Sequence, residues 1–310
     1  MAAVADSQQQ LAWEARQRPR AGLIAIASAV LMIGGVVLTA VSLQDIPRSS
    51  FLQSLGQAFK SGPIGNQPSL HIREFEYLDD HTLTFIGTGV IRALALVGLA
   101  WVVTFLALAT RARRPDMSSL ILYVALVGPV LAAIGSLLGA VGTIAAIDSF
   151  LSGPRTVDAA RDALSSPVLI AASLLADNLA PLLVAAGLLL LALNAMRVGL
   201  LTRFLGILGM ITGGLAVLTM MQTSQPLFAF VSTFWLLALA MLFFDRLPSG
   251  TPPAWRTGQA EPWPSQREVA EARRAGRSRA TPERQPEPAI AGTRTARPHP
   301  SSKKRKRKRR

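Results

Sequence analysis

Apolar residues fall in six long blocks along this chain, and polar segments separate the blocks. A helix needs about 20 predominantly apolar residues to cross the roughly 30 Å core of a bilayer, because each residue adds only ~1.5 Å. Every block reaches or approaches that length. The pattern therefore predicts an all-α fold, a polytopic membrane helix bundle with six transmembrane helices at residues 22–43, 83–110, 119–147, 167–196, 203–221 and 226–244.

Composition and charge extend this picture. Only 16% of the residues are charged, whereas soluble domains carry about a quarter. The transmembrane domain covers 22–244 and follows a polar N-terminal segment at 1–21. Lys and Arg in the connections number eight on one side and five on the other, and the richer side faces the cytoplasm. We predict a multi-pass protein of the plasma (inner) membrane with both termini cytoplasmic.

The C-terminal segment 245–310 has a different composition. It holds ten of the chain's 20 prolines and almost no aliphatic residues, with 18 Lys and Arg against 6 Asp and Glu. Such a segment cannot bury a core, so we predict a disordered, Pro-rich, basic cytoplasmic tail. Trp255 and Trp263 predict that its first part lies along the inner leaflet, and a polyproline ligand for a partner is the alternative.

The chain ends in eight consecutive basic residues. We expect them to contact anionic lipid headgroups, since each contributes about 1 kcal/mol near an anionic leaflet. An acidic partner is the alternative. Nucleic acid is expected only as a nonspecific partner, because no RNA-binding fold accompanies the cluster. The cluster comprises Lys303, Lys304, Arg305, Lys306, Arg307, Lys308, Arg309 and Arg310.

The longest connection, residues 44–83, contains two patterns of interest. Apolar residues from Phe51 to Phe59 follow helical spacing behind Ser50, a good N-cap. They predict an amphipathic helix that either lies on the membrane surface or folds back on the spans. Histidines and carboxylates then cluster between His71 and His81. Their spacing matches no metal-ligand motif, so we predict a solvated acidic segment.

Two charged side chains lie well inside predicted spans, Arg92 in the second and Asp177 in the fourth. A carboxylate at the centre of a membrane helix costs about 2.5–3.5 kcal/mol on insertion scales, so it needs a partner or water. Both residues lie about ten positions from the outer start of their spans. Three interpretations stay open: a salt bridge that fixes helix register, two side chains that snorkel separately to the outer surface, and a functional site such as a proton relay or an anion site.

The residues after Asp177 favour the third interpretation. Asn178 follows directly, and the ring of Pro181 displaces the carbonyl of residue 177 and leaves it without its N–H partner. A free carbonyl beside a carboxylate can bind a cation or a proton, although neighbouring groups often satisfy such carbonyls. The alternative function is therefore a small-solute or ion/proton-coupled transporter that uses Asp177 and Arg92.

Small residues at four-residue spacing indicate where spans approach closely. Gly135 and Gly139 form such a pair in the third span, and Gly209 and Gly213 form another in the fifth. We expect these glycines at helix–helix contacts. A homo-oligomer is a further alternative for a six-span protein of this kind.

The sequence contains none of the familiar signatures of an enzyme. No predicted span contains His, Cys is absent, and the motifs of zinc hydrolases, serine hydrolases and phosphate-binding loops are missing. We therefore predict a non-enzymatic protein with a structural or interaction role, and with no catalytic residue, metal or cofactor.

Two segments carry a resemblance to a known group. LLTRFLGILGMITGGL at 200–215 and LPSGTPPAWRTGQAEPWPS at 247–265 resemble stretches of six-span integral membrane proteins from actinobacteria, as does the terminal Lys/Arg cluster. These proteins are described only as hypothetical, and the group has no assigned activity. The resemblance implies a bacterial plasma-membrane setting and no functional residues.

Overall fold

The computed structural model describes residues 2–47, 49–59, 62–221, 225–248 and 250–262, all within one compact unit. The basic cluster at 303–310 lies outside them. The described part is all-α, as the sequence predicts. An isolated bridge between Pro68 and Thr156 is the one strand-like pairing in these ranges.

The described helices fall into long apolar elements and short connecting ones. The long ones are α1 (Ala2–Leu43), α4 (Thr82–Arg113), α5 (Ser119–Ser152), α8 (Ala180–Arg197), α9 (Arg203–Leu218) and α10 (Gln225–Phe243). The short ones are α2 (Phe51–Ala58), η1 (Ile64–Asn66), α3 (Ile72–Asp80), α6 (Val157–Leu164), α7 (Pro167–Ser173), η2 (Leu174–Leu179) and α11 (Ala254–Thr257).

Five helical stretches of the described chain are long and apolar enough to cross a membrane: 8–42, 82–113, 119–152, 167–197 and 225–243. They lie close to five of the six predicted spans. The stretch 167–197 joins α7, η2 and α8 into one rod. The remaining predicted span forms α9, which is apolar but has only 16 residues and reaches about 24 Å.

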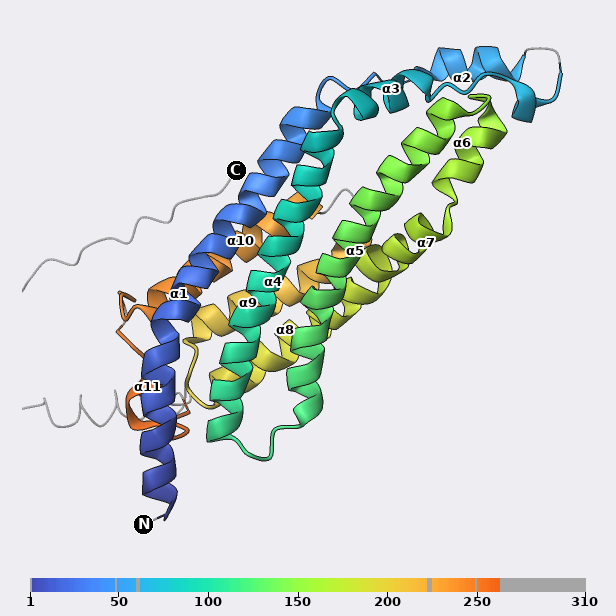
Figure 1. Cartoon of the computed structure of the whole chain (residues 1–310). Coiled ribbons are helices and arrows are strands. Elements are labelled where there is room, and N and C mark those ends of the chain that lie inside the picture. Colours follow the sequence, from blue (N-terminus) through green and yellow to red (C-terminus); the bar gives the residue numbers. More distant parts are fainter. Residues whose placement is uncertain (1, 48, 60–61, 222–224, 249, 263–310) are drawn as a thin grey trace, which may run out of the picture. The chain divides into compact units, whose positions relative to one another are not determined.

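The apolar helices pack in a ring. α1 packs on α4 and α10, α4 on α5, α5 on α8, α8 on α9, and α9 on α10 (Figure 1). Leu99 and Leu106 of α4, Leu191 of α8 and Leu236 of α10 are fully buried in the core that these helices share. The ring has two ends. We call the end that carries Arg16, Arg18, Arg20, Arg111, Arg113 and Arg114 the arginine-rich end, and the end that carries α2, α3 and α6 the loop end.

The first helix extends beyond the first predicted span. It runs unbroken from Ala2, through the polar segment 1–21 that precedes this span, and it includes Pro19. Residues 8–18 are mostly good helix formers, and Glu14 has a buried partner on α4 that holds this part of the helix against the bundle.

At the loop end, α3 and α6 cover the end of α5. Phe75 of α3 packs edge-on against Phe150 of α5, with ring centroids 4.7 Å apart, and Ala160 of α6 joins this small core. The carboxylate-rich segment is arranged as separate contacts: His71 pairs with Glu74, and His81 stacks on Tyr77. No group of three metal-type side chains forms in the described ranges.

The amphipathic helix α2 is capped by Ser50 and Gln53, which bond reciprocally to each other's backbone N–H groups. None of its residues is buried, and Phe51 and Leu52 are more than three-quarters exposed. The structure therefore contradicts the alternative in which this helix folds back on the spans.

The predicted tail also begins later than the sequence suggests. Residues 245–248 and 250–262, which we call the strap, fold back against the arginine-rich end instead of starting a disordered segment at 245. Trp255 is 3% exposed, so the prediction that it lies along a lipid leaflet is wrong. Trp263 lies outside the described residues.

The four glycines expected at helix contacts occupy different environments. A Cβ at Gly135 would collide with the backbone of Ala176 in η2, whereas at Gly139 the nearest atom, Ala172 Cβ, would lie at 3.8 Å. Gly209 faces the Trp235 indole and Ala192 Cβ, and Gly213 faces the Ala185 carbonyl oxygen at 3.1 Å. Close helix approach thus requires glycine most strictly at Gly135.

Candidate functional site

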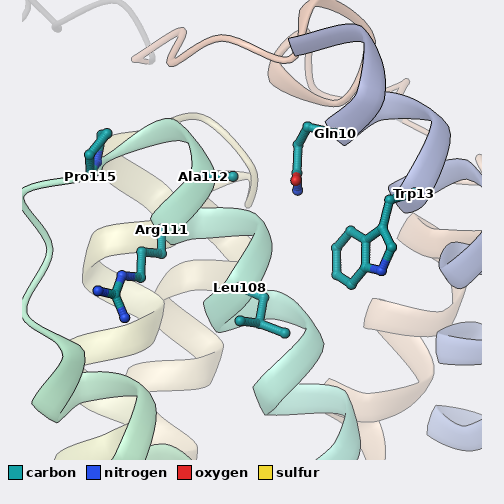
Figure 2. Close-up of a pocket in the computed structure, with 6 residues that line it drawn as sticks. All are labelled: Gln10, Trp13, Leu108, Arg111, Ala112 and Pro115. Carbon is teal, nitrogen blue, oxygen red and sulfur yellow. The ribbon is translucent and has the colours of Figure 1, made fainter. Parts of the chain in front are cut away.

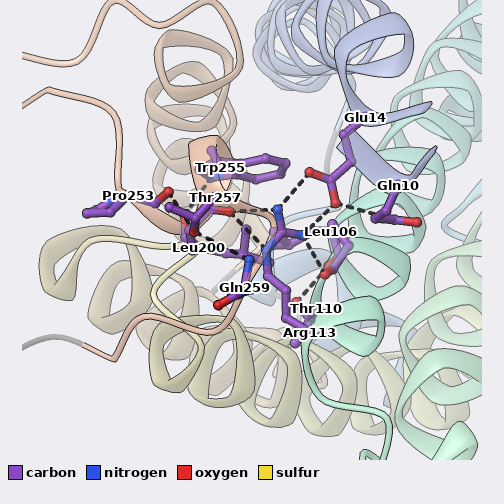
Figure 3. A network of polar contacts seen from close by, with 12 residues as sticks. Gln10, Glu14, Leu106, Thr110, Arg113, Leu200, Pro253, Trp255, Thr257 and Gln259 are labelled. Atoms are coloured by element: carbon purple, nitrogen blue, oxygen red, sulfur yellow. Dashed lines mark hydrogen bonds and ion pairs between the residues drawn. The ribbon is translucent and has the colours of Figure 1, made fainter. Parts of the chain in front are cut away.

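The most developed polar site of the described chain lies at the arginine-rich end and is built around Arg113, at the last turn of α4. Its Nη2 donates to Glu14 Oε2 at 2.8 Å, and its Nη1 donates to Glu14 Oε1, so the two side chains meet fork to fork (Figure 3). Gln10, one turn earlier on α1, donates its amide N–H to Glu14 Oε1 at 2.9 Å. The pair joins α1 to α4 across almost a hundred residues of sequence.

All five N–H groups of Arg113 have acceptors. Besides Glu14, Nη1 donates to the Ala109 carbonyl at 2.9 Å, and both Nε and Nη2 donate to the Ala254 carbonyl of the strap, at 3.1 and 2.8 Å. The side chains of Arg113 and Glu14 are 0% and 1% exposed. A buried ion pair is tolerated only when its remaining donors and acceptors are satisfied, and this pair meets that condition.

Trp255 covers the pair from the strap. The guanidinium carbon of Arg113 lies 5.4 Å from the indole centroid and that of Arg18 lies 5.0 Å away, distances typical of cation–π contacts. The indole N–H donates to the Leu200 carbonyl at 2.8 Å, in the turn between α8 and α9. The ring also packs against Phe105 and Phe243. One tryptophan therefore ties the strap to α1, α4, α10 and the α8–α9 turn.

Two further contacts hold the ends of the strap. At its start, Asp245 accepts hydrogen bonds from Arg18 and Thr251. Near its end, the Glu261 N–H donates to the Val198 carbonyl at 3.1 Å. Gly199 has φ +76°, and any Cβ there would collide with the Glu261 carbonyl, so only glycine allows this close approach.

The carboxyl of Asp245 gives this anchoring a pH dependence. Burial, the largest single influence, raises its pKa, but the hydrogen bonds from Thr251 and Arg18 and the Arg18 charge outweigh it, and the pKa lies below the ordinary 3.8. A depressed carboxyl pKa contributes stability above the unfolded value and loses it as the pH falls through the folded value. The Asp245 anchor is therefore intact at neutral pH and weakens only below about pH 3.8.

The intramembrane charges predicted from the sequence form a different arrangement. Arg92 on α4 is exposed on the side of the bundle, and Asp177 in η2 is half-buried. They interact electrostatically but make no ion pair within 4.0 Å, although both are described residues. η2 packs on α5 and α8, and α4 packs on α1, α5 and α8, but α4 and η2 share at most a weak contact with each other. The structure does not form the register-fixing salt bridge that is one interpretation of the sequence.

The backbone around Asp177 is distorted at the predicted place. Residues Leu174–Leu179 form a π-helical turn in which the Ala180 N–H donates to the Leu175 carbonyl, five residues back. Pro181, buried at the start of α8, supplies the cause, because its ring cannot share space with the carbonyl of residue 177 in a regular helix. The Asn178 amide donates to the Ser173 carbonyl at 3.0 Å. Such π turns occur frequently at functional sites.

Comparison with known proteins finds no matching family model, no similar curated protein and no similar solved structure. Function must therefore be argued from the two sites. The Arg113 site consists of paired side chains, which hold the strap against the helices. The Asp177 site has a half-buried carboxylate and an irregular backbone, which can interact with a small cation or proton.

The sequence points to the distorted backbone at Asp177 but not to the Arg113–Glu14 pair. Arg113 looked like one of several arginines that end a span, and Glu14 like one carboxylate of a polar N-terminal segment. One signal was present: Glu14 is the one acidic residue between Asp6 and Asp45, in a segment with three arginines. Its buried partner depends on the tertiary packing of α1 on α4, which no local pattern records.

Proposed function

We propose that this protein is a non-enzymatic, multi-pass plasma-membrane protein with a structural or interaction role, which presents a basic cytoplasmic tail to anionic lipid or to an acidic partner. The observation that carries the proposal is the strap. Trp255 and the Arg113–Glu14 pair hold the first part of the C-terminal segment, up to residue 262, against the arginine-rich end of the bundle.

The distribution of basic residues supports this proposal. The arginine-rich end carries the cations that the positive-inside rule associates with the cytoplasm, and this supports a cytoplasmic position for both termini. Anionic lipid of that leaflet attracts each additional basic residue by about 1 kcal/mol, so residues 303–310 supply a strong but salt-sensitive attraction.

The test uses the full chain in nanodiscs of neutral phosphatidylcholine. The nanodiscs are mixed with separate vesicles that contain phosphatidylglycerol, and co-sedimentation is measured at low and high salt. We expect the native chain to associate with the anionic vesicles at low salt and a variant with all eight basic residues at 303–310 changed to Gln to lose this association. Equal association of the two proteins would contradict the proposal. Competition by polyglutamate would favour an acidic partner over lipid.

The second candidate, a small-solute or ion/proton-coupled transporter that uses Asp177 and Arg92, is favoured by the π turn. Because the chain has no Cys, Asp177→Cys can be labelled in intact cells with a membrane-impermeant thiol reagent. The controls are Asp79→Cys at the exposed loop end and Leu188→Cys in the buried core. Rapid labelling at 177 supports the transporter. Labelling at 79 without labelling at 177 argues against a water path to Asp177 from outside.

A further inference from the structure

A groove lies between α1 and α4 at the arginine-rich end, next to the Glu14–Arg113 pair. It has a volume of about 580 Å³ and is open on one side. Figure 2 shows Trp13 of α1 at one edge, Leu108 of α4 in the middle and the guanidinium of Arg111 at the other edge. We call it the α1–α4 groove, and its remaining lining residues are Gln10, Ala112 and Pro115.

The packing of α1 on α4 determines at which level along the bundle this groove lies. α1 and α4 are antiparallel, with Gly35 facing Ile91 in the middle of the bundle and Glu14 paired with Arg113 at its end. The apolar part of α4 ends at Thr110. We therefore place the last turn of the hydrocarbon zone at Leu108 and the start of the headgroups at Trp13, a position that tryptophan favours in membrane proteins.

The chemistry of the groove changes along its length. Leu108 is 39% exposed and offers an apolar surface to an acyl chain. Arg111 is exposed and makes no ion pair with any described residue, and a guanidinium matches the geometry of a phosphate. Glu14, which Gln10 of the groove contacts, is already paired with Arg113. The groove thus combines an apolar floor with an unpaired cation at the membrane boundary.

We propose that the α1–α4 groove binds one anionic phospholipid from the leaflet at the arginine-rich end, with the phosphate on Arg111 and an acyl chain along Leu108. Basic pockets between membrane helices are suited to anionic headgroups. This site goes beyond the basic tail, because it lies on the helix bundle, takes a single lipid and requires no residue after 115. Gln10 links it to the buried pair, since its amide donates to Glu14 from the groove wall.

Native mass spectrometry of the full chain in detergent tests the proposal. The protein is titrated with phosphatidylglycerol and, separately, with phosphatidylcholine, and the retained lipid is counted. We expect one phosphatidylglycerol to bind more tightly than phosphatidylcholine. Arg111→Gln should weaken phosphatidylglycerol binding about fivefold and leave phosphatidylcholine unchanged. The matched control is Arg197→Gln, an exposed arginine at the end of α8 outside the groove, which should behave like the native chain.

A bulky substitution tests the contribution of the groove's shape separately from that of the Arg111 charge. Ala112 is exposed and lines the groove, so Ala112→Trp should fill the groove and lower retention of both lipids without changing the net charge. The variant with Gln at all eight basic positions of 303–310 should keep the bound phosphatidylglycerol even if it no longer associates with anionic vesicles. Unchanged phosphatidylglycerol retention in Arg111→Gln, or equal retention of the two lipids by the native chain, would overturn the proposal.

Discussion

The protein places opposite charges among apolar helices at two positions, and it treats them differently. Glu14 and Arg113 are buried, meet fork to fork and have every donor of the guanidinium satisfied. Arg92 and Asp177 interact without direct contact, and the backbone beside the aspartate is irregular. The first arrangement fixes a structure, because removal of either partner leaves an uncompensated buried charge. The second leaves a carboxylate available to water, a proton or a cation.

The largest effect that tests this comparison is expected from Glu14→Ala. It leaves the Arg113 guanidinium buried without its counter-charge, which should lower the free energy of unfolding by about 3–5 kcal/mol. The measurement is unfolding of the full chain by SDS in mixed micelles. The matched control is Asp116→Ala, which removes an exposed ion pair with Arg114 and should cost less than about 1 kcal/mol. Similar losses in the two variants would show that the buried pair is not a special anchor.

The next effect concerns the strap. Trp255→Ala removes a buried indole, a change that costs about 3–5 kcal/mol in packed cores, and should release the strap from the bundle. Trypsin should then cleave after Arg256 much faster, as followed by mass spectrometry of the intact protein. Trp255→Phe keeps an aromatic ring but leaves the buried Leu200 carbonyl without its donor, so it should cost about 1–3 kcal/mol and release the strap less. Equal cleavage of the native chain and the Ala variant would contradict this role of Trp255.

A smaller effect probes the packing around the π turn. Gly135→Ala drives a methyl group into the backbone of Ala176 and should cost about 1–3 kcal/mol of stability. Gly139→Ala, one turn away on the same face, meets Ala172 at an ordinary distance and should change stability by less than about 1 kcal/mol, since alanine favours helix. Thermal unfolding in detergent compares the two. A destabilised Gly139→Ala with a tolerant Gly135→Ala would reverse the assignment of the tight contact.

The smallest effect is expected at the intramembrane charges. A double-mutant cycle with Arg92→Ala and Asp177→Ala should give a coupling energy below about 1 kcal/mol, because the side chains do not touch. The same cycle on Glu14 and Arg113 should give a coupling of several kcal/mol. A large coupling between Arg92 and Asp177 would mean that the two form a direct pair in the membrane.

A feature can be predicted from the sequence when the residues that cause it lie close together along the chain. Helix positions are local, because twenty apolar residues in a row can cross a bilayer only as a helix, and the apolar blocks match described helices closely. The distortion at Asp177 is also local, because its cause, Pro181, lies four residues away. Both features could therefore be read from the sequence.

The Arg113 site could not be predicted in the same way. It combines a side chain from α1, one from α4 and a carbonyl from the strap, and it depends on how α1 packs on α4. Trp255 shows the limit most clearly. A Pro-rich, basic neighbourhood is typical of a disordered tail, yet the first part of it is held by a buried indole with a buried acceptor and two guanidinium neighbours.

The position of Ala254 has a consequence for the order in which the protein is made. A ribosome synthesises about 5–20 residues per second, so on the order of 10–30 s separate the synthesis of Arg113 from that of Ala254. During that interval the Arg113 guanidinium lacks one of its acceptors, and the arginine-rich end lacks its cover. During biosynthesis the strap therefore packs against the bundle only after all of the long helices have been made. A nascent chain that stops before Ala254 carries an unfinished ion pair, a defect that distinguishes it from the full-length protein.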